Sequence, residues 1–134
     1  MTSLQTWERE KLNQLTGEVL DAAICVHKEM GPGLLESVYQ ACLVKELMLR
    51  GYLVESFVSI RLIYKGNVLD KEYVIDILVE GEVILELKSV EAVMPVHEAQ
   101  IISYLKLANN RVGLLINFNV PLLINGFKRF VNHF

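Results

Sequence analysis

The stretch EYVIDILVEGEVILELKS, residues 72–89, decides the fold. It contains two runs rich in Val, Ile and Leu, 72–79 and 83–89, which are typical of β-strands. Only three residues, centred on Gly81, separate the runs, and a connection that short joins antiparallel neighbours. The stretch therefore predicts an antiparallel pair of strands.

Charged residues interrupt this apolar pair at one level. A turn about Gly81 predicts the cross-strand pairs Val79–Val83, Leu78–Ile84, Ile77–Leu85 and Asp76–Glu86. Side chains two apart on a strand leave the same face, so Lys88 lies beside Glu86. Two carboxylates and an ammonium among apolar residues favour a bound Mg²⁺ or Mn²⁺, which prefer oxygen ligands. A salt bridge on a half-exposed sheet face is the alternative interpretation.

The period of the apolar pattern predicts the other elements. Helices are expected at 6–30, 34–50 and 95–108, and further strands at 58–64, 111–118 and 126–131. This order predicts an α/β fold of the mixed α+β kind. Its central mixed β-sheet combines a three-stranded antiparallel meander with a crossover strand and is flanked by helices. We expect one domain, 1–134, divided into an N-terminal helix, 1–30, and a core, 31–134.

Composition limits the possible settings and partners. Hydrophobic residues make up 52% of the 134 residues, which predicts either a compact apolar core or apolar surface shared with a second copy. The net charge of −3 excludes a general polyanion-binding surface. Cys25 and Cys42 fall in helical patterns and are expected to be buried free thiols. Without a signal-peptide core or a membrane-length apolar run, the sequence predicts a cytoplasmic protein with no membrane partner.

Two helices add polar residues that could join the acids. Glu36 heads the apolar stripe of its helix, where it either joins the acids or only stabilises the first helical turn through the helix dipole. His97, Gln100 and Tyr104 share one face of the third predicted helix, and His97 is alternatively an exposed residue of its first turn. The helix that follows the Glu86–Lys88 strand packs back across the sheet, so Gln100 and Tyr104 are expected at the same site.

The ordered set of these residues resembles a known family. Gly33-x-x-Glu36-x-x-Tyr39, then Asp76, Glu86-x-Lys88 and Gln100-x-x-x-Tyr104, is similar to the GxxExxY proteins, a RecB-like branch of the PD-(D/E)xK nuclease superfamily. The resemblance extends from about His27 to Val131. One departure is Ile75, which stands where the superfamily name has proline, a position that varies widely in the superfamily.

The resemblance implies a restriction-endonuclease-like core and a role for each residue. Asp76, Glu86 and the Leu87 carbonyl would hold Mg²⁺ or Mn²⁺, with Glu36 as a further ligand, direct or through water. His27, an upstream helical histidine, is a further candidate metal ligand. Lys88 would position or activate the attacking water, and Gln100 and Tyr104 would orient Lys88 or the phosphate.

Three functions remain open at the level of the sequence. The resemblance implies a metal-dependent nuclease that hydrolyses phosphodiester bonds of nucleic acid, DNA rather than RNA. The acidic net charge instead favours a non-cleaving nucleic-acid-binding or regulatory domain of the same fold, or a nuclease that depends on a protein partner for its grip on the substrate. The third interpretation is a structural interaction protein that forms homo-oligomers and whose carboxylates are incidental.

Overall fold

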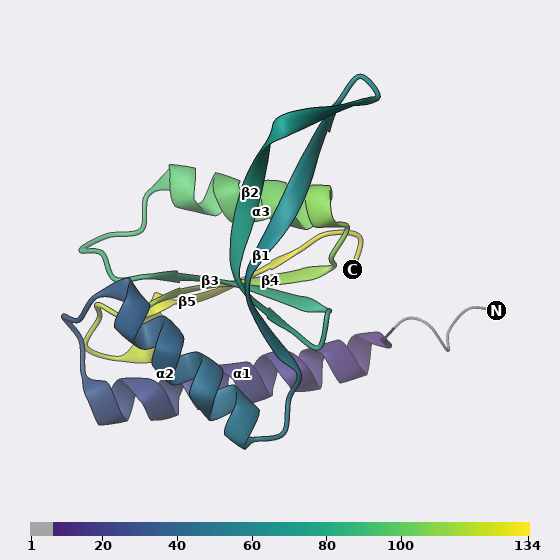
Figure 1. Cartoon of the computed structure of the whole chain (residues 1–134). Helices are drawn as coiled ribbons and strands as arrows, with labels where there is room; N and C mark the ends of the chain where they lie inside the picture. Colours follow the sequence, from purple (N-terminus) through teal and green to yellow (C-terminus); the bar gives the residue numbers. More distant parts are fainter. Residues whose placement is uncertain (1–6) are drawn as a thin grey trace.

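The computed structural model describes residues 7–134. The elements are α1 (Arg9–Met30), α2 (Glu36–Leu49), β1 (Val54–Tyr64), β2 (Asn67–Val79), β3 (Val83–Lys88), α3 (Pro95–Ala108), β4 (Val112–Asn117), η2 (Leu123–Gly126) and β5 (Phe127–Val131) (Figure 1). The helix start expected at residue 6 lies outside the described residues. Within residues 7–134, none of the helices has the length and apolar character needed to cross a membrane.

One mixed sheet of five strands organises the fold, in the order β1-β2-β3-β4-β5. β1, β2 and β3 are consecutive antiparallel neighbours, which confirms the predicted meander. α3 is the crossover that brings β4 parallel to β3, and β5 then pairs antiparallel with β4. The predicted α+β class and the predicted strand near the C-terminus are therefore both confirmed.

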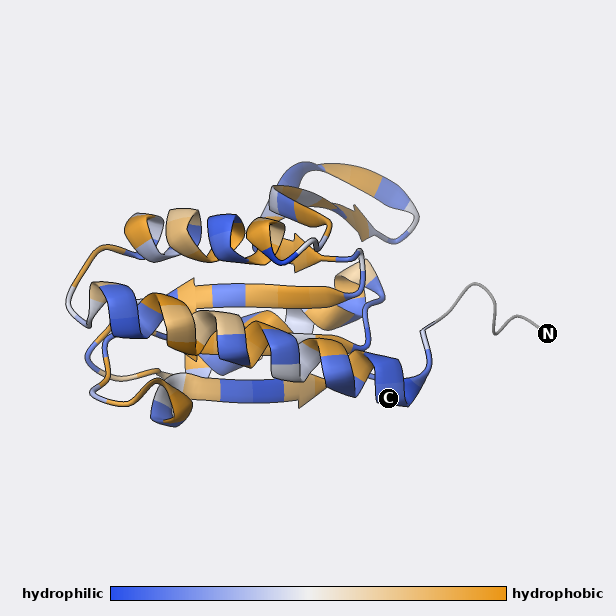
Figure 2. Ribbon diagram, turned by 90° about the horizontal axis from the view of Figure 1, so that it is seen from below, coloured by the Kyte–Doolittle hydropathy of each residue, from blue (hydrophilic) through white to orange (hydrophobic). Residues whose placement is uncertain are grey.

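The helices cover both faces of the sheet. α1 and α2 lie on one face and α3 on the other (Figure 1). In Figure 2, α1, which runs into the grey N-terminal trace, alternates between hydrophobic and hydrophilic residues, as a helix with one buried face does. Gly113 on β4 leaves room for α3, because a Cβ there would lie 3.1 Å from Ile101 Cγ1 and 3.2 Å from Leu105 Cδ2.

Two clusters of buried residues follow from these layers. The larger cluster joins α1 and α2 to the sheet through residues such as Val19, Leu43, Leu85 and Leu114. The smaller cluster lies on the α3 face and consists of Ile60, Ile75, Ile84, Tyr104 and Leu105. The site described below lies where β2 passes from one cluster to the other.

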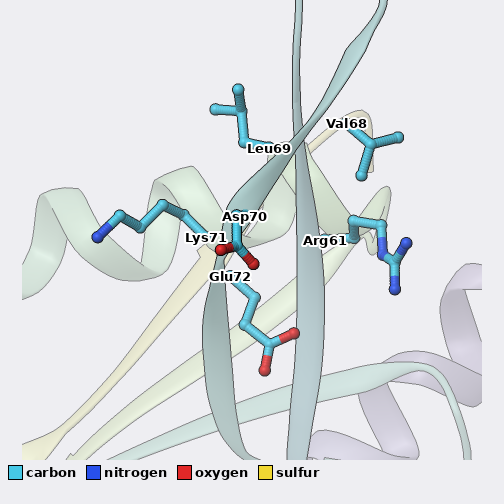
Figure 3. A pocket seen from close by; sticks show the side chains of 6 residues that line it. All are labelled: Arg61, Val68, Leu69, Asp70, Lys71 and Glu72. Carbon is cyan, nitrogen blue, oxygen red and sulfur yellow. The ribbon is translucent and has the colours of Figure 1, made fainter.

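The outer half of the β1–β2 hairpin, residues 61–72, extends away from the rest of the sheet (Figure 1). We call it the arm. Its register shifts between Arg61, which pairs with Glu72, and Ile63, which pairs with Val68, so β2 bulges there. Arg61 and residues 68–72 line an open hollow of about 700 Å³, with side chains on both sides of the strands (Figure 3). The arm extends β2 by five residues beyond its predicted start at residue 72.

The expected burial of both cysteines is wrong. Cys25 is exposed and Cys42 is half-buried, and both are free thiols. The apolar stripe of α1 passes through Ala22, Ala23 and Val26, so Cys25 faces away from the sheet. Both thiols line an apolar hollow of about 360 Å³ between α1 and α2.

Candidate active site

β2 and β3 separate at Asp76. The predicted register is confirmed for the three pairs up to Ile77–Leu85, where the backbone ladder ends. The predicted fourth pair is replaced by two hydrogen bonds from side chain to backbone. The Asp76 N–H donates to Glu86 Oε2 over 2.8 Å, and the Leu87 N–H donates to Asp76 Oδ2 over 2.8 Å. Each carboxylate thus accepts from the backbone of the opposite strand, and the two acids are held together.

A change in the hairpin explains why the strands separate here. Ile77 packs in the cluster beneath α1 and α2, whereas Ile75 packs in the cluster beneath α3. On β1, Phe57 adopts a left-handed φ of 55°, and the ladder skips the pair of Phe57 with Asp76. A residue in that conformation breaks the alternation of side chains, so the hairpin turns toward α3 at this level. Asp76 therefore lies at the base of the arm.

Burial disfavours the ionised form of both Asp76 and Glu86. Glu86 is only 4% exposed. Burial first, and then the charge of Asp76, raise the pKa of Glu86 to about 8. Burial also raises the pKa of Asp76, although the hydrogen bond from Leu87 and the charge of Lys88 act in the opposite direction. Without a cation, Glu86 is therefore largely protonated at neutral pH.

Lys88 lies on the same face of β3 as Glu86 and is half-buried. Its charge lowers the pKa of both Asp76 and Glu86, so the ammonium is close enough to stabilise both carboxylates. Within residues 7–134 the ammonium forms no hydrogen bond and no ion pair. The alternative of a plain salt bridge between Lys88 and an acid is therefore not what the structure shows. Lys88 remains available to a ligand.

Glu36 is the first residue of α2 and is exposed. Gln40, four residues later on the same face of α2, donates to the Asp76 carbonyl, so Glu36 lies on the face of α2 turned toward that strand. The charge of Glu36 contributes to the raised pKa of Asp76 and of Glu86. The loop before it is fixed by Tyr39, whose hydroxyl donates to the Gly31 carbonyl over 2.5 Å and accepts from the Leu34 N–H over 3.1 Å. The ring of Tyr39 stacks on Phe118, with centroids 4.4 Å apart. Tyr39 therefore anchors the segment that presents Glu36.

Sequence reasoning missed two side chains that fix the backbone of the site. Gln40, which is 9% exposed, donates from Nε2 to the Asp76 carbonyl over 2.8 Å. Asn117, which is 3% exposed, pairs with Lys88 in the β3–β4 ladder. Its amide donates to the Val90 carbonyl over 3.0 Å and accepts from the Val90 N–H over 3.1 Å. An amide at an otherwise apolar, inward-facing position was the available signal for both residues.

α3 supplies one buried and one exposed candidate. Tyr104 is 4% exposed, and burial followed by the charges of Glu86 and Asp76 raises its pKa to about 12. Gln100, one turn earlier, has its side chain in solvent. His97 accepts the Met94 N–H on Nδ1 over 3.0 Å, which caps the helix. The structure thus packs Tyr104 with Ile84, on the face of β3 that also carries Glu86, leaves Gln100 at the surface and gives His97 a structural role.

His27 is not with these residues. Its Nε2 lies 2.8 Å from the Val120 carbonyl oxygen, which can only accept, so this nitrogen is a donor. The ring is 8% exposed and lies near Phe118, with centroids 6.5 Å apart. This contact ties α1 to the loop after β4, and nothing in it places His27 at the acids as the expected metal ligand.

The donor atoms of the site suit a hard divalent cation with a small protein ligand set. Among residues 7–134 there is no group of three or more His, Cys, Asp or Glu side chains arranged to hold a metal ion. Glu36, expected as a further ligand either directly or through water, is therefore not grouped with Asp76 and Glu86 in such a set. Asp76 and Glu86 each use one carboxylate oxygen for a backbone N–H, and the second oxygen accepts no such bond. Carboxylate oxygens are the ligands that Mg²⁺ and Mn²⁺ prefer, and Mg²⁺ is commonly bound through one or two carboxylates.

Comparisons with known proteins bear on the same stretch of chain. A family model described as the PD-(D/E)XK nuclease superfamily matches residues 13–130, a range that contains every residue of the candidate site. Searches of curated proteins and of solved structures give no match. The matched range runs from α1 to β5, so it covers both helical layers and the whole sheet.

Proposed function

The chain belongs to the PD-(D/E)XK nuclease superfamily, and we propose that it is a metal-dependent phosphodiesterase that hydrolyses nucleic acid, DNA in preference to RNA. Within the superfamily we assign it to the RecB-like GxxExxY branch, because Gly33, Glu36 and Tyr39 have the spacing of that motif. The observation that carries the proposal is the interlocked pair of Asp76 and Glu86 beside Lys88, which has no ion-pair partner among residues 7–134.

Asp76 and Glu86 would hold Mg²⁺ or Mn²⁺, with the Leu87 carbonyl as a further ligand and Glu36 acting through water. When bound, such a cation polarises a phosphoryl oxygen and supplies a nucleophilic water at neutral pH. The raised pKa of Glu86 supports this assignment, because a nearby cation would favour the ionised carboxylate that burial disfavours.

The other side chains would act on the substrate. The ammonium of Lys88 would donate to the scissile phosphate or to the attacking water and offset the charge that develops on the phosphate. The hydroxyl of Tyr104 keeps its proton at neutral pH, because its pKa is about 12, and would donate to the phosphate or orient Lys88. The exposed amide of Gln100 would make a second contact with the phosphate.

One observation favours a second candidate function. Each acid satisfies a backbone N–H of the other strand, so the fold uses both carboxylates even without a metal. A non-cleaving nucleic-acid-binding or regulatory domain would therefore keep the same pair. The net charge of −3 also limits the grip on a polyanion that the chain could provide by itself.

A cleavage assay with isosteric variants separates the two functions. We expect the wild type to cut single- or double-stranded DNA in Mn²⁺ or Mg²⁺, and Asp76→Asn and Lys88→Met to lose at least about 100-fold in rate, the scale seen when one charge-stabilising group is removed. Asp76→Asn keeps an oxygen to accept the Leu87 N–H, so its fold is preserved. The exposed residues Asp70 and Lys45 provide the controls Asp70→Asn and Lys45→Met.

Calorimetric titration with Mn²⁺ accompanies the assay. Binding by the wild type that is lost in Asp76→Asn, together with cleavage, supports the nuclease. Binding without cleavage of any DNA or RNA, single- or double-stranded, favours the non-cleaving domain. If Mn²⁺ does not bind and nothing is cut, the metal-dependent nuclease is wrong.

A further inference from the structure

Tyr73 is an exposed aromatic residue beside the buried acids. It lies on β2, three residues before Asp76, and its side chain is 42% exposed. One part of the ring packs against Tyr104, with centroids 5.2 Å apart and an interplanar angle of 45°. Because Tyr104 is only 4% exposed, the ring beneath Tyr73 is held in place by the core.

The neighbours of Tyr73 fix its position further. Its partner on β1 is Ile60, which belongs to the buried cluster beneath α3. Tyr104 belongs to the same cluster, and so does Ile84, which shares a face of β3 with Glu86 two residues later. Tyr73 and Tyr104 therefore lie on the face of the sheet to which Glu86 belongs, and the ring of Tyr73 is the partly solvent-accessible one.

We propose that Tyr73 is a stacking site for one unpaired nucleobase of the substrate, next to the phosphate held at Asp76 and Glu86. The inference rests on the proposed function and narrows its substrate to a nucleic acid with at least one unpaired nucleotide beside the bond that is cut.

The chemistry of the surface favours a base over other ligands. The contact with Tyr104 restrains the ring of Tyr73 and leaves part of it in solvent, where a base can stack on it. Such stacking raises affinity by roughly 5- to 150-fold per base. A paired base in a duplex already has both faces covered by its neighbours, so only an unpaired one can use the site. The chain carries a net charge of −3, so phosphate contacts alone give it little affinity.

Fluorescence anisotropy with a labelled single-stranded oligodeoxynucleotide tests the site in EDTA and again in Ca²⁺, a larger cation that also takes oxygen ligands. We expect Tyr73→Ala and Tyr73→Leu to weaken binding about tenfold, within the range for a lost stacked base, and Tyr73→Phe to bind like the wild type. Tyr73→Leu keeps apolar packing on Tyr104, so its loss would not come from unfolding. Tyr64, 61% exposed on the arm, provides the control Tyr64→Ala, which should change nothing.

A change in the oligonucleotide provides the complementary test. Replacing successive nucleotides by abasic ones should find one position at which wild-type binding weakens as much as Tyr73→Ala weakens it. Tyr73→Ala should then lose nothing further with that oligonucleotide, because the two changes remove the same contact. Equal binding by the wild type and Tyr73→Leu, or independent losses at every abasic position, would overturn the inference.

The cleavage assay separates this inference from the proposed function. Cleavage with an unchanged KM in Tyr73→Leu would reject the stacking site and leave the nuclease in place. Binding that depends on Tyr73 without any cleavage would reject the nuclease and keep the stacking site. An oligonucleotide that the wild type does not bind in either buffer rejects the stacking site as well.

Discussion

β3 and the arm both contain β-branched and other apolar residues, but these lie in opposite environments. In β3, five consecutive residues, Val83 to Leu87, are each at most 4% exposed. In the arm, Ile63, Tyr64 and Val68 are each more than 55% exposed. The many hydrophobic residues of the chain thus lie in two kinds of place, a close-packed core and a projecting hairpin. The comparison teaches that apolar residues predict a strand in both places, but predict burial only where helices cover both faces of the sheet.

The largest expected effect on stability comes from comparing a buried leucine in β3 with an exposed isoleucine in the arm. Leu85→Ala in β3 should lower the free energy of unfolding by about 2–5 kcal/mol, because it leaves a cavity in a filled core. Ile63→Ala in the arm should change it by less than about 0.5 kcal/mol, since the side chain is already in solvent. Chemical denaturation measures both. A large, concentration-dependent loss for Ile63→Ala would show that the arm is covered by a second copy in solution.

Glu86, at the junction of β3 and the base of the arm, should make the stability of the protein depend on pH. In the folded protein the pKa of Glu86 is about 8, against an ordinary value of 4.5. Above pH 4.5 the unfolded chain therefore binds fewer protons than the folded one. The free energy of unfolding should fall by about 1.4 kcal/mol per pH unit as the pH rises from 4.5 toward 8. The full stabilisation that protonated Glu86 gives the folded state is present only below pH 4.5.

Glu86→Gln should remove this dependence, because the amide oxygen still accepts the Asp76 N–H but carries no charge. Denaturation in EDTA between pH 5 and 8 compares the two proteins, and we expect the variant to be the more stable one near the upper end. The exposed Glu55→Gln is the control and should keep the wild-type slope. A variant that is less stable at every pH would mean that the ionised carboxylate stabilises the fold, as in a salt bridge.

The smallest expected effect is at the loop that presents Glu36. Tyr39→Phe removes the hydroxyl that bonds to Gly31 and Leu34 but keeps the stack on Phe118. We expect a loss of about 1 kcal/mol of unfolding free energy. The exposed Tyr64→Phe in the arm should lose nothing measurable, and equal losses in the two variants would remove the contrast between the buried and projecting regions.

The same contrast shows what could be predicted from the sequence. The short turn about Gly81, which has a φ of 66°, sets the register of β2 against β3, so three of four pairs were predictable. The fourth was not, because Asp76 lies where the hairpin turns toward α3, and side chains replace the ladder there. The arm before residue 72 was also missed, since residues 67–71 are polar or exposed and lack an alternating pattern.

Some residues of the candidate site could likewise be predicted from the sequence, and others could not. Asp76, Glu86 and Lys88 could be brought together from strand period and turn length, because the predicted register holds as far as Ile77–Leu85, the pair next to the two acids. The contributions of Gln40 and Asn117 could not, because each acts across a distance along the chain that periodicity does not encode. Glu36 was expected from its motif as a further metal ligand, direct or through water, and the structure leaves its side chain exposed.

The two hydrogen bonds that join Asp76 and Glu86 to the opposite strands predict how related sequences diverge. A lineage that gave up cleavage would still be selected to keep both acids, because the backbone of each strand depends on the carboxylate of the other. Lys88 makes no such bond within residues 7–134, so selection for folding alone would let it drift. In a set of related sequences, the residue at the Lys88 position should therefore separate active members from inactive ones, and the two acids should not.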